Sequence, residues 1–175
     1  MNTKRLNEII RVNHAGEHGA VAIYKGQINA LKLMGDKKTL PLIYDMLEGE
    51  KVHAEEFDKI IKKKRTRATA LMPLWHLSGF TLGVASALGG RDTLMACTEA
   101  VEEVIDKHYS DQIKELEDSK KEPEILEIIK QFHEDELEHE EIAKNEISEN
   151  TPALKAFKKI VKVGCRAAIS LSEKI

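Results

Sequence analysis

The feature that most limits the fold of this chain is a spacing of glutamate and histidine that occurs twice. Each copy has a single glutamate, followed 33 or 34 residues later by the pair Glu-x-x-His, and the two copies are offset by 85 to 86 residues. One Glu-x-x-His pair is a weak signal, but the duplication of the whole spacing is much more specific. The six residues concerned are Glu17, Glu50, His53, Glu102, Glu136 and His139.

The similarity between the two copies extends beyond these six residues. Matching residues follow the two single glutamates at identical offsets: Tyr24, Gln27, Ile28 and Leu31 in the first copy, and Tyr109, Gln112, Ile113 and Leu116 in the second. Matching at this level predicts an internal repeat of about residues 11–60 and 96–146. We therefore expect two similar structural units within one domain covering residues 1–175.

The repeated spacing predicts a metal centre inside a four-helix bundle. Residues three apart lie on one face of a helix, so each Glu-x-x-His pair can bind one ion from one helix. The single glutamates Glu17 and Glu102 then come from the other two helices and are expected to bridge the ions. Four carboxylates and two divalent ions balance in charge, which makes burial tolerable. Oxygen-rich sites with one imidazole per metal favour iron or manganese over zinc.

Composition agrees with one helical domain. Hydrophobic residues make up 42% of the chain and charged residues 33%, while aromatic residues are only 5%. The net charge of -3 gives no support for binding nucleic acid. Cys97 and Cys165 lack the spacing of a metal site, and we interpret them as reduced thiols. Residues 1–11 have no apolar core, so we expect no signal peptide.

Apolar periodicity and the positions of glycine and proline predict five helices. These expected helices cover residues 5–34, 38–63, 92–118, 123–149 and 153–173. The fold class is therefore all-α, a four-helix bundle with an extra apolar segment between its second and third helices and a C-terminal helix.

The extra segment, residues 68–90, contains no charged residue and follows the basic run 62–67. Its length permits a membrane span, but Pro73, His76 and several glycines interrupt it. We expect a helix or short hairpin that packs on the bundle and enters one leaflet, with the basic run near anionic lipid head groups. A buried fifth helix is the alternative.

Several further residues have two readings. Tyr24 and Tyr109 lie two turns after the single glutamates, so they are either core residues or participants in redox or substrate chemistry. Asp135 is expected to hold a ligand histidine in place. Gly16 and Gly19 flank Glu17 and provide either a slot for a flat substrate or close helix packing. His14, His18, His76 and His133 show no ligand pattern, and Glu99 and Glu103 compete with Glu102 as the third glutamate.

The motifs resemble those of the demethoxyubiquinone hydroxylases, the di-iron monooxygenases of ubiquinone biosynthesis. The resemblance covers residues 11–173 and rests on Arg11-Val12-Asn13-His14-Ala15-Gly16-Glu17, Glu50-x-x-His53, Ala100-Val101-Glu102-Glu103 running to His108-Tyr109, and Glu136-x-x-His139. It implies a ferritin-like bundle and two iron ions bound by the six repeated residues. It also implies that His108 and Tyr109 act near the substrate and the electron path.

The implied reaction uses O2 to hydroxylate C6 of the ring of a prenylated quinol, demethoxyubiquinol. The expected location is the cytoplasmic side of the cell membrane, as a peripheral protein, with a homo-oligomer or other ubiquinone-biosynthesis proteins as further partners. Two other classes share part of the pattern. An iron-storage or peroxide-removing protein of the rubrerythrin or manganese-catalase type would use similar ligands, and a helical adaptor would bind no metal.

Overall fold

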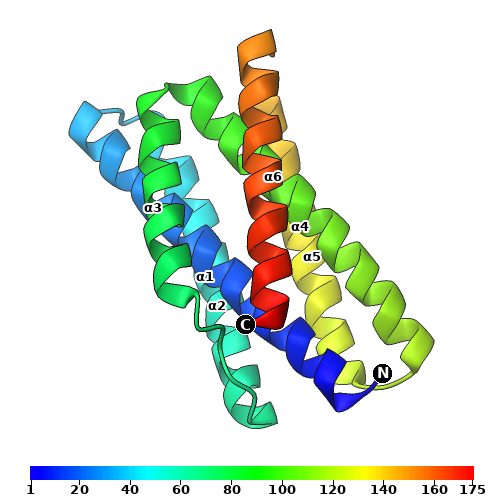
Figure 1. The fold of residues 1–175 in the computed structure, drawn as a ribbon. Coiled ribbons are helices and arrows are strands. Elements are labelled where there is room, and N and C mark those ends of the chain that lie inside the picture. Colours follow the sequence, from blue (N-terminus) through cyan, green and yellow to red (C-terminus); the bar gives the residue numbers. More distant parts are fainter.

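The computed structural model describes residues 1–175 as six helices without a strand (Figure 1). The helices are α1 (Thr3–Met34), α2 (Leu40–Lys64), α3 (Met72–Leu88), α4 (Arg91–Ser119), α5 (Pro123–Asn145) and α6 (Pro152–Lys174). The predicted all-α class is confirmed, and five helices start and end close to their expected positions. The largest difference is at the end of the expected helix 123–149, because the corresponding helix α5 ends at Asn145.

Local sequence explains where the helices begin and end. The side chain of Asn2 accepts a hydrogen bond from the backbone N–H of Arg5, which caps the start of α1. Gly35 ends α1 in the left-handed conformation with φ of 73°. Proline lies in the first turn of α2, α3, α5 and α6, where its missing N–H costs no helical hydrogen bond.

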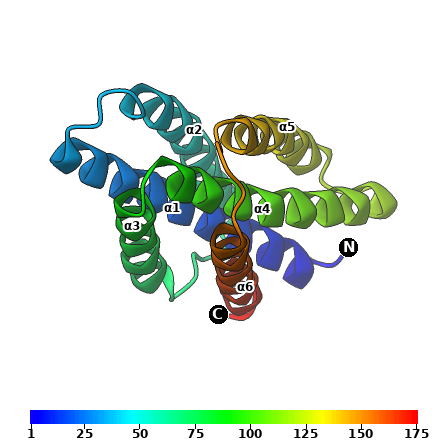
Figure 2. The ribbon, with the colours of Figure 1, turned by 90° about the horizontal axis from the view of Figure 1, so that it is seen from above.

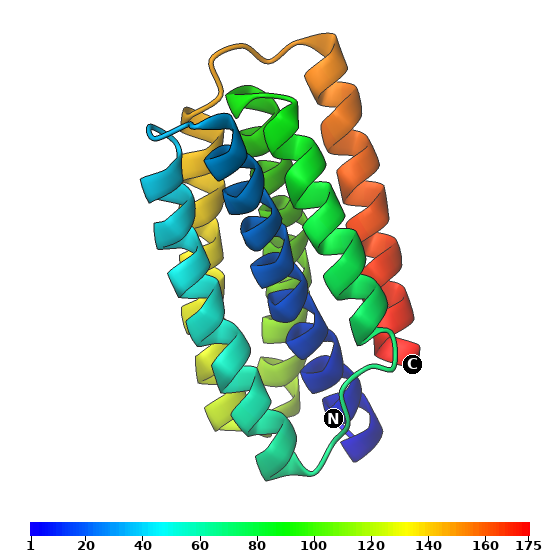
Figure 3. The same ribbon diagram turned by 90° about the vertical axis from the view of Figure 1, so that its left-hand side faces the viewer.

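Helices α1, α2, α4 and α5 form the four-helix bundle, and Figure 3 shows them running side by side. Their apolar side chains pack into two main clusters. One cluster contains Tyr24, Leu47 and Met95, and the other contains Ile9 and Phe57. On α1, α4 and α5 the repeated glutamates fall between the stretches that feed these clusters. The middle of the bundle is thus polar, with an apolar core on either side.

The two remaining helices each lie against one helix of the bundle. Helix α3 packs along α1, and α6 packs mainly along α4, so both are on the same side of the bundle when it is viewed from above (Figure 2). Each half of the chain therefore consists of a helical hairpin and a third helix that covers its first helix. The repeat predicted over residues 11–60 and 96–146 has a counterpart here that includes α3 and α6.

Helix α3 approaches α1 very closely because both helices have glycine at the contact. A Cβ atom at Gly79 would lie 2.9 Å from the carbonyl oxygen of Gly19, and one at Gly83 would collide with the carbonyl oxygen of Ile23. Gly26 of α1 meets the backbone of Phe80 in the same way. The segment 68–90 therefore forms one helix, not a hairpin, and its glycines serve helix packing.

The opposite face of α3 is exposed. Leu77 is 66% exposed and Leu74 50%, so α3 is not the fully buried core helix considered as the alternative. No helix of the chain has both the length and the apolar character that a membrane span requires.

Part of the basic run contacts the bundle. Lys63 pairs with Glu124 and Lys64 with Glu122, both at the start of α5. Two of its five cations thus connect α2 to α5, and contact of the run with lipid head groups stays a prediction.

Candidate metal centre

The structure brings the six repeated residues together in the middle of the bundle. Five of them are almost completely buried, and His139 is partly exposed. Their donor atoms form two overlapping groups, each with all atoms within 4.8 Å of one another. The first group is Glu17, Glu50, His53 and Glu136, and the second is Glu50, Glu102, Glu136 and His139.

The overlap changes the roles expected for the glutamates. Glu50 and Glu136 belong to both groups, whereas Glu17 and Glu102 each belong to one. This grouping favours the two Glu-x-x-His glutamates as the residues shared by both ions, while bridging by the single glutamates stays a prediction. Sequence spacing could not show this, because the choice depends on how the four helices are rotated about their axes.

Several buried donor atoms in this cluster have no hydrogen-bond partner. They are both carboxylate oxygens of Glu50, Oε2 of Glu136, and Nδ1 of His53 and of His139. Buried polar atoms are almost always satisfied, so a set of orphans pointing at one another indicates a missing ligand. Nδ1 of His53 lies 3.2 Å from Oε1 of Glu136, and Nδ1 of His139 lies 3.2 Å from Oε1 of Glu50. The residues fit a pair of divalent ions.

Without metal, the cluster balances its charge with protons. Burial and neighbouring carboxylates raise the pKa values of Glu50 and Glu102 well above normal. Burial by itself opposes ionisation of His53 and Glu136, but close contacts with their oppositely charged neighbours prevail. The pKa of His53 is therefore raised to about 12, and that of Glu136 is lowered to about 2. Divalent ions would replace these protons, so metal binding should release protons.

Two tyrosines connect the halves across the cluster. The hydroxyl of Tyr24 donates a hydrogen bond to Oε1 of Glu102 over 3.0 Å, and the hydroxyl of Tyr109 donates one to Oε1 of Glu17. Each tyrosine thus orients the single glutamate of the other half. Burial and the nearby carboxylates raise the pKa values of both tyrosines well above normal, so both remain neutral donors.

The two histidines of the cluster are supported differently. Nε2 of His53 lies 3.0 Å from Oδ2 of Asp135, which confirms the expected contact between Asp135 and a cluster histidine. The repeat places Gly49 at the position equivalent to Asp135, and a Cβ there would lie 3.5 Å from the His139 ring. His139 therefore has no equivalent carboxylate.

His108 lies outside the cluster, at the end of a short polar chain. Nε2 of His108 is 2.7 Å from the side-chain nitrogen of Gln112, and Gln112 exchanges two hydrogen bonds with Asn13. Burial lowers the pKa of His108. In the first half the equivalent of His108 is Ile23, and the equivalent of Asn13 is Thr98, which Gln27 contacts at 3.5 Å. The two halves thus differ most just beyond the cluster.

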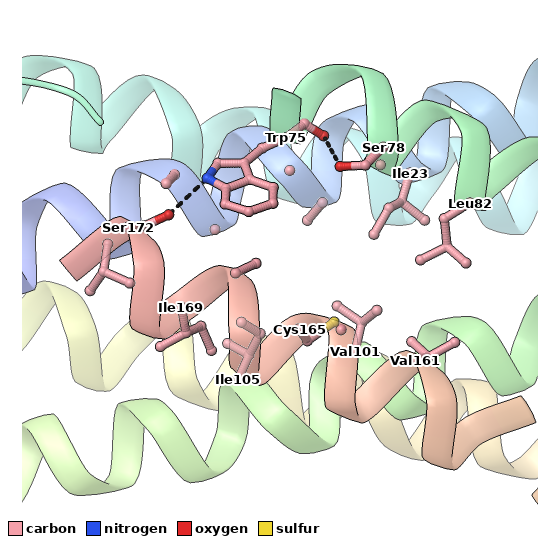
Figure 4. A pocket seen from close by; sticks show the side chains of 18 of the residues that line it. Ile23, Trp75, Ser78, Leu82, Val101, Ile105, Val161, Cys165, Ile169 and Ser172 are labelled. Carbon is pink, nitrogen blue, oxygen red and sulfur yellow. Dashed lines mark hydrogen bonds between the residues drawn. The ribbon is translucent and has the colours of Figure 1, made fainter. Parts of the chain in front are cut away.

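The structure contains an apolar pocket of about 420 Å³, which none of the six cluster residues lines (Figure 4). It lies between α3 and α6 and has α1 and α4 as its floor. Gly16 and Gly19 line it on either side of Glu17, and Val101, next to Glu102, lines it from α4. A Cβ at Gly19 would have no atom within 4 Å. Of the two roles considered for these glycines, a slot for a flat substrate is therefore favoured over close packing of another helix against their Cα atoms.

One end of the pocket is closed by polar contacts between helices. The indole Nε1 of Trp75 donates a hydrogen bond of 2.8 Å to Oγ of Ser172, which joins α3 to α6 (Figure 4). The guanidinium of Arg11 donates to the backbone carbonyls of Ser172 and Glu173. His108 is not among the residues that line this pocket.

The competing acidic residues have other partners. Glu99 pairs with Lys158 and Glu103 with Lys162, both on α6, so neither carboxylate faces the cluster.

The structure also gives partners to histidines that showed no pattern in the sequence. His14 and His18 both contact Asp58, and the spacing of four residues between them was the signal that could have revealed this.

Comparison with known proteins identifies the family. A model of the family described as "Ubiquinone biosynthesis protein COQ7" matches residues 4–172. The chain belongs to the COQ7 family. Relatives in this family include the mitochondrial NADPH-dependent 3-demethoxyubiquinone 3-hydroxylases of rat and human. The rat protein is 44% identical over 99% of this chain and 80% of its own length, and the human protein is 45% identical over 97% and 78%.

A bacterial COQ7-family relative, the 3-demethoxyubiquinol 3-hydroxylase of Rhodospirillum rubrum, is 40% identical over 97% of this chain and 78% of its own length. These names number the hydroxylated ring carbon 3, where we expected C6. The predicted family is confirmed, and with it the expectation of an oxidoreductase of ubiquinone biosynthesis.

Proposed function

We propose that this COQ7-family chain binds two iron ions through the six repeated residues and hydroxylates the ring of a prenylated demethoxyubiquinol with O2. The observation that carries the proposal is an apolar pocket lined by Gly16 and Val101, the sequence neighbours of Glu17 and Glu102, in a chain with a buried cluster of four glutamates and two histidines. Neither a peroxide-removing protein nor an iron store requires such a pocket next to its metals. In the net reaction one oxygen atom enters the ring and the other leaves as water, with two electrons from a reductant such as the NADPH in the relatives' names.

The residues of the cluster have distinct roles in this proposal. Glu50 and Glu136, which belong to both donor groups, would hold both ions, while Glu17 and Glu102 would each hold one and are oriented by the two tyrosine hydroxyls. Bound iron would supply the activation of O2, which side chains alone cannot perform. The protein holds the ligands in a buried site and excludes water from it. Tyr109 contacts Glu17, whose neighbours Gly16 and Gly19 line the pocket, and Tyr24 contacts Glu102, whose neighbour Val101 also lines it.

His108 is proposed to act away from the substrate. It does not line the pocket, but it directly precedes Tyr109 and ends the polar chain through Gln112 and Asn13. This position suits a role in moving electrons or protons toward the cluster better than contact with the ring.

The pocket suits the ring and the first part of an apolar tail. Its volume of about 420 Å³ is within the range of roughly 300–1,000 Å³ that is usual for small-molecule sites. Its lining is mostly hydrophobic, and the glycines leave room for a flat ring beside Glu17. The longer prenyl tail must continue outside the protein.

The faces beside the pocket suit contact with a bilayer. Exposed apolar side chains on the two flanking helices are Leu74, Leu77, Phe80 and Leu88 on α3, and Ile160, Val163 and Leu171 on α6. We propose that these faces rest on the membrane as a peripheral surface, at the cytoplasmic side of the cell membrane, so that the quinol enters without crossing water.

Metal analysis tests the ligand assignment. Wild-type protein should contain two irons, and Glu136→Ala should lose at least one because it removes a ligand of both ions. His53→Ala should lose the ion of the first group while the far-ultraviolet circular dichroism still shows a helical protein. Two irons retained in both variants would rule out this ligand set.

Gly19→Leu tests the pocket. Its side chain should fill the slot and abolish hydroxylation of demethoxyubiquinol while two irons remain bound. Gly19→Ala is the matched control, since it removes the glycine but adds only one carbon in open space. Hydroxylation by Gly19→Leu at the rate of Gly19→Ala would mean that the ring binds elsewhere. Rapid peroxide decomposition by an iron-loaded wild type that does not hydroxylate would favour the catalase-type alternative.

Liposome sedimentation tests the membrane surface. Leu74→Ser combined with Leu77→Ser should weaken binding to anionic liposomes without changing the iron content, because both side chains are exposed. The control pair Leu33→Ser and Val52→Ser removes equally exposed apolar side chains from α1 and α2. Unchanged sedimentation of the α3 variant would contradict the proposed orientation.

A further inference from the structure

Three side chains that the proposed iron centre does not use meet between α1 and α2. Nε2 of His14 and Nε2 of His18 lie 2.8 Å and 3.1 Å from one oxygen, Oδ1 of Asp58. The two rings come from successive turns of α1, with their centroids 4.5 Å apart. The three donor atoms all lie within 4.8 Å of one another. We propose that His14, His18 and Asp58 form a separate binding site for one divalent transition-metal ion of the zinc type.

The geometry is close to that of a zinc site. Zinc binds imidazole nitrogen and carboxylate oxygen at about 2.0–2.2 Å in a tetrahedron, so neighbouring ligand atoms lie roughly 3.3 Å apart. The distances from both histidine nitrogens to Asp58 are shorter by less than about 0.5 Å, so small rotations of three side chains admit an ion. Two histidines four residues apart on a helix supply ligands on one face.

His14 and Asp58 carry the net charges that a metal requires, and a shift of the His14 proton from Nε2 to the unpartnered Nδ1 would open Nε2 to the ion. A ligand imidazole must be neutral, and burial lowers the pKa of His14, so its ring is uncharged at neutral pH. Burial alone would raise the pKa of Asp58, but hydrogen bonds from His18 and His14 outweigh it and lower the pKa. Nδ1 of His14 has no partner, so the ring makes all its polar contacts on the side of Asp58.

The fourth coordination position faces α3. The His76 ring is exposed, and its centroid lies 5.8 Å from that of His18. A change of rotamer brings His76 to the ion, and water occupies the position otherwise. An ion bound in this way ties the start of α3 to α1 and α2. Because α3 forms one wall of the apolar pocket, the ion would hold that wall in place.

Zinc titration of iron-loaded protein tests the site, with iron and zinc counted afterwards. We expect one zinc per wild-type chain with no loss of iron. His18→Ala and Asp58→Asn should each weaken zinc binding by at least about 100-fold, because each removes a direct ligand. Both positions are partly exposed, so these variants should fold. His133→Ala is the matched control, since His133 pairs with Asp106 but has no second histidine beside it.

Thermal unfolding gives a second readout. Zinc should raise the melting temperature of the wild type and of His133→Ala, but not of His18→Ala or Asp58→Asn. The test of this site does not depend on the iron proposal, because its readout is the number of zinc ions bound per chain, which should be one lower in the variants than in the wild type. Absence of that ion in the wild type, or its retention in both variants, would overturn the inference and leave only a hydrogen-bonded trio.

Discussion

The two halves of the molecule hold their third helices by different physical means. Helix α3 lies on α1 through glycine contacts, where Gly79 and Gly83 allow the backbones to touch. Helix α6 lies on α4 through ion pairs, where Lys158 and Lys162 reach Glu99 and Glu103. The cluster between the halves takes two glutamates and one histidine from each. The repeat has therefore been retained where ligands are needed and has diverged where the helices pack.

The difference also explains the shape of the pocket. Glycine contacts bring α3 close to α1, while lysine side chains hold α6 over α4, and the space between the two helices remains apolar. Because both helices lie on the same side of the bundle, the pocket lies on that side.

The largest effect should come from Gly83→Ala on α3. The added methyl group would collide with the carbonyl oxygen of Ile23, so α3 must move away from α1. We expect a loss of about 3 kcal/mol or more in the free energy of unfolding, measured by urea denaturation. Gly164→Ala on α6 is the control, because nothing lies within 4 Å of that Cβ and the helix should gain up to about 1 kcal/mol. Equal free energies of unfolding for the two variants would contradict the conclusion that glycine contacts hold α3 but not α6.

The next largest effect should come from Lys158→Met on α6. The side chains of Glu99 and Lys158 are only 9% and 11% exposed, so the variant leaves a carboxylate buried without its partner. Such a loss costs about 3 kcal/mol. Adding Glu99→Leu should recover most of it, because the unpaired charge is then gone. A double variant as unstable as the single one would show that packing, not charge, holds α6.

A smaller effect should distinguish His108 from Ile23, its equivalent in the other half. Burial lowers the pKa of His108 below the value of about 6.5 expected for the unfolded chain. The unfolded state therefore binds more protons below pH 6.5, and the stability present above that pH is lost as the pH falls. The slope from this residue should be at most about 1.4 kcal/mol per pH unit. In melting curves between pH 5 and 7.5, His108→Gln should depend less on pH than the wild type, and parallel curves would contradict this.

The smallest effect should come from Lys162→Met, at the second ion pair of α6. The Glu103 side chain is 43% exposed, so water replaces the lost partner. We expect a loss below about 1 kcal/mol that disappears in 0.5 M salt. A loss as large as that of Lys158→Met would mean that both ion pairs are equally important despite their different exposure.

The sequence by itself determined the class of fold and the six residues that meet in the cluster. Glu17, Glu50, His53, Glu102, Glu136 and His139 could be selected because a repeated spacing leaves little freedom in a helix, where residues three apart must share a face. The contact of Asp135 with a cluster histidine followed from the same rule. Family resemblance then indicated the chemistry, because the motifs match over nearly the whole chain.

Only the tertiary structure decided which residues meet across helices. Glu50 and Glu136 belong to both donor groups while Glu17 and Glu102 each belong to one, and each tyrosine contacts the single glutamate of the other half. Both arrangements depend on how the helices are rotated about their axes. Residues 68–90 became a half-exposed helix whose glycines touch α1. Periodicity along one helix reports which side chains share a face, but it carries no information about the neighbouring helix that this face meets. That choice is made by packing, in which shape and charge of residues far apart in the chain are matched at once.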